Sequence, residues 1–251
     1  MATATAATPS GEPPLSQMQR VINVFVAPSK TFNDIRRNSS WFVPWLLMAV
    51  MSYAFVGVVA TRVGWETVNE NQLKMQPKRA EQMEKLKEQQ PQQYERQHNI
   101  GILVTKVISF VFPLVILLNS VIIAAIMMAT MNFGASAKTG FGACLAVVIY
   151  ASLPGLVKSA LAILFLFLGV GVDSFTFQNP IASNPGVFAT VGTPLYSLLS
   201  ALDIFTIWIL VLASIGFSCI SGLKRSTTMS FVFGWYALVT MIGVGFTALF
   251  A

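Results

Sequence analysis

The chain has 251 residues, of which 55% are hydrophobic, 12% aromatic and only 10% charged. Soluble globular domains carry about 25% charged residues, so this composition indicates a membrane protein and excludes a large water-soluble enzyme. The formal net charge of +6 is modest and comes mostly from segments flanking apolar stretches, where basic residues orient membrane spans rather than bind nucleic acid. Cys144 and Cys219 both lie in apolar stretches and His98 is the only histidine. We therefore expect neither a disulfide framework nor a zinc site built from several histidines.

Residues 1–14 are predicted to form a disordered tail. They are mainly Ala, Thr, Pro and Gly, and cannot bury enough apolar area to offset the entropy of ordering. A signal peptide is not expected, because no basic cluster followed by an apolar core occurs before Trp41.

Residues 15–40 are predicted to form two short amphipathic helices on the cytoplasmic side. Pro28 is expected to end the first, and Thr31 and Asp34 have the spacing of a capping box that would start the second. Both helices can lie in the membrane surface with Arg20 and other basic residues near lipid phosphates. The alternative is that they pack on their own membrane domain.

Five apolar stretches are long enough to cross a bilayer, because about 20 residues of helix span a ~30 Å hydrocarbon core. The predicted spans lie at about 41–62, 104–131, 140–168, 201–222 and 229–250. The fold is therefore predicted to be all-α, a polytopic transmembrane helical bundle of about five spans over residues 41–251. Pro113 and Asn119 in the second span predict a kink or a buried polar contact.

Two segments between the spans are polar. Residues 63–103 are rich in charge and glutamine, and Pro77 and Pro91 occupy positions typical of helix starts, which predicts an aqueous helical loop. Two interpretations of this loop stay open. It binds a partner, or it is a solvated hairpin that packs on itself. Residues 173–202 contain no basic residue and are predicted to form turns in water.

The number of crossings over residues 139–172 is ambiguous, because the segment is too long for one crossing and its second part is too short for an untilted one. One crossing agrees better with the rule that short basic loops face the cytoplasm, since Lys138, Lys224 and Arg225 then lie on the side of the amino terminus. This topology places the amino terminus in the cytoplasm and the carboxyl terminus outside.

Lys158 is a cation inside the third span. If the span begins near Phe141, Lys158 lies about 25 Å along it, where it can extend to the outer interface. The alternative is an ion pair with Asp203, which otherwise is a helix amino-terminal acid favoured by the helix dipole. If the helix instead continues through Phe167, Lys158 is buried in the membrane and becomes the leading functional candidate.

Ser214, Ser218 and Gly222 are spaced four residues apart in the fourth span. Small residues at this spacing form a ridge that lets another helix approach closely. We expect the ridge to pack within the bundle, with a homodimer through this face as the alternative.

Three stretches resemble the Yip domain family, membrane proteins named for interacting with Ypt/Rab GTPases, in its prokaryotic branch. They are residues 27–32 (APSKTF), residues 150–154 (YASLP) and residues 203–208 (DIFTIW). The resemblance adds Tyr150 and Pro154 to the candidate residues. It implies a non-enzymatic membrane organiser or partner scaffold in the prokaryotic inner membrane, which contacts lipid and another protein through residues 15–40 or 63–103.

The common catalytic motifs do not occur in the sequence. The chain has no glycine-rich phosphate loop with a lysine, and Asp173 and Asp203 lie at span ends rather than facing each other within the membrane. We expect no catalytic, cofactor-binding or metal-binding residues. The candidate functional or packing residues are Lys158, Asp203, Tyr150, Pro154, Ser214, Ser218 and Gly222. The alternative function is a small-solute or ion transporter or channel with Lys158 and Asp203 in a polar path. A cavity reaching the midplane beside Lys158 would favour transport, and a tightly packed bundle would favour a scaffold.

Overall fold

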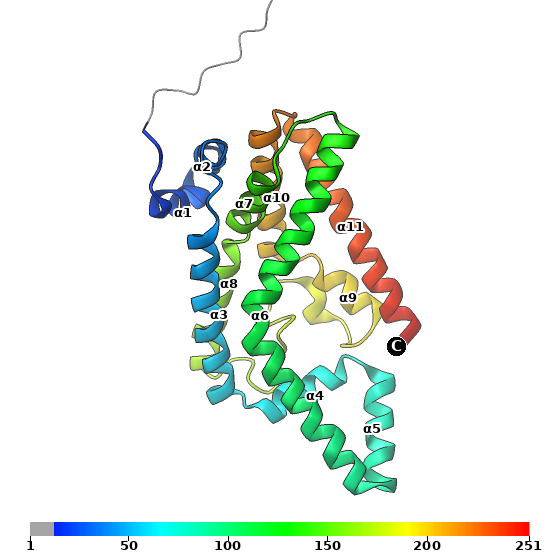
Figure 1. Ribbon diagram of the computed structural model, residues 1–251. Helices are drawn as coiled ribbons and strands as arrows, with labels where there is room; N and C mark the ends of the chain where they lie inside the picture. The colour runs from blue at the N-terminus through cyan, green and yellow to red at the C-terminus, as the bar shows by residue number, and fades with distance from the viewer. Residues whose placement is uncertain (1–12, 251) are drawn as a thin grey trace, which may run out of the picture.

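The computed structural model describes residues 13–250, and within them the chain is helical and contains no β-strand (Figure 1). Nearly all of the predicted tail, residues 1–12, lies outside the described residues. The elements are α1 (Gln17–Val26), α2 (Pro28–Ile35), α3 (Phe42–Arg62), α4 (Trp65–Lys74), α5 (Pro77–Gln89), α6 (Pro91–Gly134), α7 (Phe141–Ala151), α8 (Pro154–Phe167), the 3-10 helix η1 (Pro185–Phe188), α9 (Pro194–Ser200), α10 (Ile204–Ser221) and α11 (Arg225–Phe250).

Five helical segments of the described chain are long and apolar enough to cross a membrane. They are Phe42–Arg62, Pro91–Gly134, Phe141–Phe167, Ile204–Ser221 and Arg225–Leu249. The predicted all-α polytopic bundle is therefore confirmed. The helix pair α1 and α2 lies at the same end of the bundle as the α6–α7 and α10–α11 connections, whereas α4 and α5 lie at the opposite end (Figure 1).

The third span is built from two helices that follow one another in the same direction, α7 and α8 (Figure 1). The break falls just before Pro154, which is at the start of α8. Proline has no N–H to donate, and its ring would clash with the carbonyl four residues earlier in an uninterrupted helix. Ser152 and Leu153 carry the chain across this break with backbone bonds to Val148 and Tyr150.

The long helix α6 joins the polar segment to the second span without interruption. Pro77 and Pro91 begin α5 and α6, as predicted. Pro113 lies inside α6, and its carbonyl accepts a hydrogen bond from the Trp45 indole N–H at 3.1 Å. Asn119 makes no hydrogen bond through its side chain with any residue that the structure describes, so the predicted polar contact is not found for it among those residues.

The predicted start of the second helix is wrong. Helix α2 begins at Pro28, because proline is pre-organised for the first helical position, where its missing N–H costs nothing. Thr31 and Asp34 do not form a capping box. Both side chains are buried against α1, where the Thr31 hydroxyl donates to the Arg20 carbonyl at 2.9 Å. The capping box in this region belongs to Ser16 at the start of α1.

Helix α10 packs against α2 and α7 through Gly216. A Cβ atom added there would lie 2.6 Å from Val147 Cγ1 and 2.9 Å from Phe32 Cδ1, closer than real Cβ contacts allow. Both neighbouring side chains are buried in the main core. The three helices can approach this closely only because the position has no side chain.

Gly216→Ala is therefore expected to lower the free energy of unfolding by about 1–3 kcal/mol, because a well-packed core resists an added methyl group. Gly234→Ala in α11 is the matched control, since a Cβ there meets nothing within 4 Å. Denaturant unfolding of the detergent-purified protein measures both. Equal stability of the two variants would contradict the close packing at Gly216.

Candidate functional site

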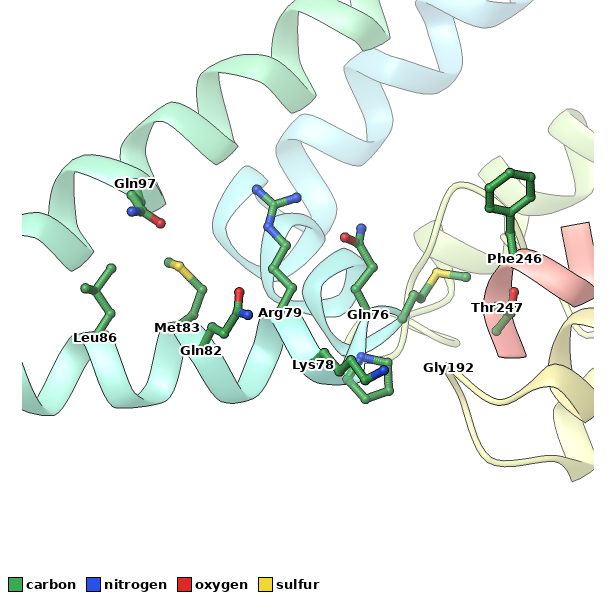
Figure 2. Close-up of a pocket in the computed structure, with 12 residues that line it drawn as sticks. Gln76, Lys78, Arg79, Gln82, Met83, Leu86, Gln97, Gly192, Phe246 and Thr247 are labelled. Atoms are coloured by element: carbon green, nitrogen blue, oxygen red, sulfur yellow. The ribbon is translucent and has the colours of Figure 1, made fainter. Parts of the chain in front are cut away.

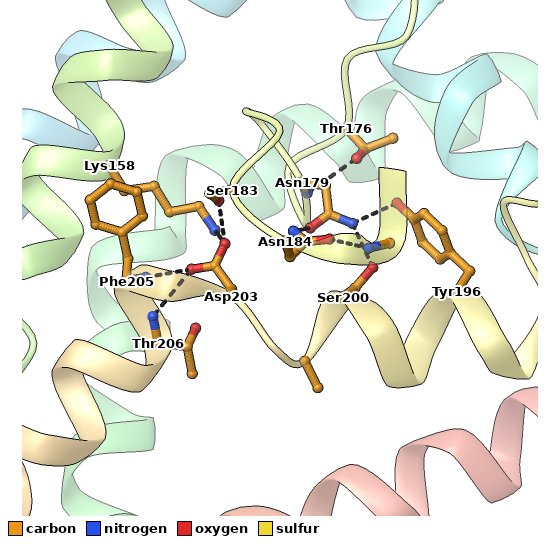
Figure 3. Close-up of polar contacts among 12 residues, drawn as sticks. Lys158, Thr176, Asn179, Ser183, Asn184, Tyr196, Ser200, Asp203, Phe205 and Thr206 are labelled. Carbon is orange, nitrogen blue, oxygen red and sulfur yellow. Dashed lines mark hydrogen bonds and ion pairs between the residues drawn. The ribbon is translucent and has the colours of Figure 1, made fainter. Parts of the chain in front are cut away.

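Lys158 and Asp203 form an ion pair between α8 and α10, with 2.9 Å between Lys158 Nζ and Asp203 Oδ2. Asp203 also caps α10, because its other carboxylate oxygen accepts the backbone N–H groups of Phe205 and Thr206, each at 3.1 Å. The Ser183 hydroxyl donates to the same carboxylate (Figure 3). Asp203 is only 3% exposed. The pair predicted as an alternative is thus present, and Asp203 is both a helix cap and a counter-ion.

Helix α8 extends well beyond Lys158. Helix α8 continues to Phe167, whose ring lies 4.6 Å from the Arg62 guanidinium at the end of α3. Lys158 lies about 13 Å before that point, at about 1.5 Å per residue. This is close to half of a ~30 Å hydrocarbon core. Helix α8 continues through Phe167, which is the case in which the sequence analysis expects Lys158 to be the leading functional candidate, and Asp203 lies at the start of the fourth span.

The segment between α8 and α10 is folded around its own polar side chains (Figure 3). The Asn179 amide donates to the Tyr196 hydroxyl at 2.6 Å and to Ser200 Oγ at 2.9 Å. The Asn184 amide donates to Asn179 Oδ1 at 2.8 Å. The turns predicted for residues 173–202 are present, but several of their side chains face one another rather than water. The only sequence signal was the Asn-Pro pairs, which favour turns stabilised by the Asn side chain.

A cavity of about 910 Å³ lies beside the ion pair. Its walls come from α3, α6, α7, α8 and residues 177–180, and one end of it is formed by α4 and α5. Lys158 and Asn119 both lie on its wall, and none of the described residues that line it is Asp or Glu. A smaller cavity of about 710 Å³ lies between α5, α6 and the end of α11. Figure 2 shows Arg79, Met83 and Gln97, which line both cavities.

Tyr150 and Pro154, two of the candidate residues from the sequence, have structural roles in the bundle. Tyr150 is fully buried, and its hydroxyl donates to Gln17 Oε1 at 2.7 Å, which ties α7 to α1. Pro154 begins α8 and sets the break in the third span. Tyr150 and Pro154 therefore hold the helices that surround the site.

One residue of the predicted ridge in the fourth span, Gly222, does not belong to it. Gly222 lies beyond the end of α10 in the left-handed conformation, with φ +74°, because glycine is favoured at a helix C-terminus where the chain must turn. Ser214 is 1% exposed. Its carbonyl accepts the Thr228 hydroxyl of α11 at 2.8 Å. The Ser218 hydroxyl donates to the Leu223 carbonyl at 2.8 Å. At Ser214 this face therefore packs within the chain.

A second ion pair, which is more deeply buried, was missed by the sequence analysis. Arg20 is 1% exposed, and its Nε lies 2.7 Å from Asp34 Oδ2. Its Nη1 donates to the Asn38 carbonyl at 2.8 Å. Arg20 therefore joins α1 to α2. The sequence analysis placed it near lipid phosphates, and the structure corrects that expectation.

These features define the chain as a polytopic, all-helical membrane protein with one buried ion pair, one partly buried ion pair and a cavity beside the second. Residues 22–249 match the family model described as the Yip1 domain. The chain therefore belongs to the Yip1 domain family, and the resemblance found in the sequence is confirmed. No curated protein matches the chain, and no solved structure does.

Proposed function

We propose that the protein is a non-enzymatic membrane organiser that acts on one leaflet through the helix pair α1 and α2. The observation that carries this proposal is an apolar stripe on α1. Met18, Ile22 and Val26 follow one another at helical spacing and are 58%, 54% and 73% exposed. An amphipathic helix with such a face lies in the membrane interface, with the face buried about 5–10 Å into the boundary of the acyl chains.

Rigid attachment to the spans would hold α1 inserted in one leaflet, where it acts as a wedge that pushes the lipids apart. The Arg20–Asp34 pair joins α1 to α2, and the bond from Tyr150 to Gln17 joins α1 to the third span. Phe25 also packs edge-on against Trp208 of α10, with 5.7 Å between the ring centroids. A helix held in this way expands one leaflet and cannot rotate its apolar face away.

The wedge acts, in this proposal, on the cytoplasmic leaflet of the cell membrane. The α6–α7 and α10–α11 connections, which contain Lys138 and Lys224, lie at the end of the bundle that carries α1 and α2 (Figure 1), and the Arg225 guanidinium donates to Ser29 Oγ at 3.0 Å. Basic residues in short connections face the cytoplasm. This distribution supports a cytoplasmic amino terminus and a carboxyl terminus outside.

Reconstitution of the full chain into vesicles tests the wedge. The unaltered protein is expected to shift the vesicles toward smaller diameters in cryo-electron micrographs, because it expands the leaflet that holds α1. The triple variant with Met18, Ile22 and Val26 changed to Ser is expected to lose this shift. The control places Ser at Val107, Val111 and Leu114, three exposed apolar positions of α6. Equal reshaping by the α1 variant and the unaltered protein would refute the proposal.

Transport of a small solute or ion is a second candidate, favoured by the cavity. Lys158 and Asn119 are both on the cavity wall within spans. An amide without a partner is costly in hydrocarbon, so Asn119 favours water or a polar solute in the cavity. The pairing of Lys158 with Asp203 also supplies the two residues that the sequence proposed for a polar path.

A further inference from the structure

We propose that the large cavity binds one anionic phospholipid from the bilayer, with its phosphate at Arg79 and one acyl chain along α6. The polarity of the wall is divided along the length of the cavity. Polar side chains gather at the end formed by α4, α5 and the start of α6, namely Asn69, Gln72, Gln76, Arg79, Gln97 and His98. The remainder of the wall is mostly apolar, and its polar members are Ser and Thr side chains together with Asn119, Lys158 and Gln178. A cavity divided in this way fits a molecule with a polar head and an apolar chain.

The charge at the polar end selects an anion. Arg79 carries a full positive charge, and its side chain makes no hydrogen bond or ion pair with any residue that the structure describes. Figure 2 shows it beside Gln76 and Met83 on the lining of the smaller cavity, and the large cavity shares these three residues. The described lining contains no Asp or Glu. Lys158 is already neutralised by Asp203. Arg79 is therefore the cation left to bind a phosphate, which guanidinium groups recognise through paired N–H donors.

The apolar wall selects a lipid rather than a free anion. It follows α6 from Ile100 to Ile123, which is about 35 Å of helix at about 1.5 Å per residue. One leaflet contributes about 15 Å of hydrocarbon, half of a ~30 Å core, so the wall is long enough for an acyl chain. Ile108 and Phe112 line the cavity and are also exposed on the surface of the span. In this proposal the acyl chain enters the cavity from the bilayer past these two exposed side chains.

Binding is measured on the full chain purified in detergent, with dioleoyl phosphatidylglycerol as the anionic probe and dioleoyl phosphatidylcholine as the zwitterionic one. Native mass spectrometry counts the bound lipids, and a titration of the thermal midpoint gives the apparent Kd. We expect one phosphatidylglycerol per chain and binding of phosphatidylcholine that is about fivefold weaker, since one basic residue near a lipid surface contributes about that factor.

Two variants test the head and chain positions separately. Arg79→Gln is expected to weaken phosphatidylglycerol binding about fivefold, whereas Arg96→Gln removes the same charge from an exposed position outside the cavity and is expected to leave it unchanged. Val104→Trp fills the apolar wall and is expected to weaken both lipids, whereas Leu103→Trp, on a neighbouring residue off the wall, is not.

The outcomes separate this site from the wedge of α1. Equal Kd values for the Arg79 and Arg96 variants, or for the Val104 and Leu103 variants, would overturn the site. Equal binding of the two lipids would overturn the selection for an anion. The triple serine variant of α1 keeps the cavity intact and is expected to bind phosphatidylglycerol normally, so a failure of vesicle reshaping leaves this result unchanged.

Discussion

Replacing Arg20 with Met is expected to lower the free energy of unfolding by about 3–5 kcal/mol, because Asp34 is then left buried without its counter-ion. Asp34 is 7% exposed and lies on the face of α2 that packs against α1. The two helices should also separate from the bundle before the spans unfold. Denaturant unfolding in detergent measures the stability, and the rate of proteolytic cleavage within residues 15–40 measures the separation.

Two further variants identify the buried charge as the cause. Lys30→Gln removes a positive charge from the exposed face of α2 and is expected to change the stability little. Arg20→Met combined with Asp34→Leu removes both charges, and is expected to recover most of the loss, because two apolar side chains can replace a buried pair at little cost. If the double variant is as unstable as Arg20→Met alone, the loss comes from the packing of Arg20 rather than from its charge.

The membrane spans could be predicted from the sequence because each is set by a local property. About 20 apolar residues in a row cross the bilayer whatever their neighbours are. Pro77 and Pro91 likewise mark helix starts through the chemistry of their own rings. The start of α2 was predicted wrongly because a local pattern was overridden by tertiary contacts. Thr31 and Asp34 have capping-box spacing, but tertiary contacts with Arg20 use both side chains.

The features that could not be predicted depend on which helices meet. Arg20 and Asp34 are on separate helices, and their separation of 14 positions in the sequence does not indicate that they pair. No sequence pattern marks Gly216 as the point of close approach between helices. The small residues around it predicted a ridge instead, and Gly222 is not part of that ridge. The cavity also arises from several helices at once. Asp203 and Lys158 were found as an alternative because both interrupt apolar sequence, where a charge requires a partner.

Lys158→Met is expected to lower the free energy of unfolding by about 3–5 kcal/mol, because it leaves the Asp203 carboxylate without a cation inside the bundle. Adding Asp203→Asn to this variant is expected to recover most of the loss. Asparagine carries no charge and is as good a helix cap as aspartate, so the bonds to Phe205 and Thr206 can persist. Denaturant unfolding measures both variants. Lys106→Met is the control, since Lys106 lies on α6 but does not line the cavity.

The stable double variant, Lys158→Met with Asp203→Asn, also separates the two candidate functions. If Lys158 and Asp203 only join α8 to α10, this variant should reshape vesicles as the unaltered protein does. If they line a polar path, the unaltered protein should raise the leak of protons or potassium ions in vesicles that carry a trapped indicator dye, and the double variant should abolish that increase. A leak equal to that of protein-free vesicles would remove the ion-path form of the transport proposal. The ion pair would then be a joint between helices, which holds the third and fourth spans in register beneath the wedge.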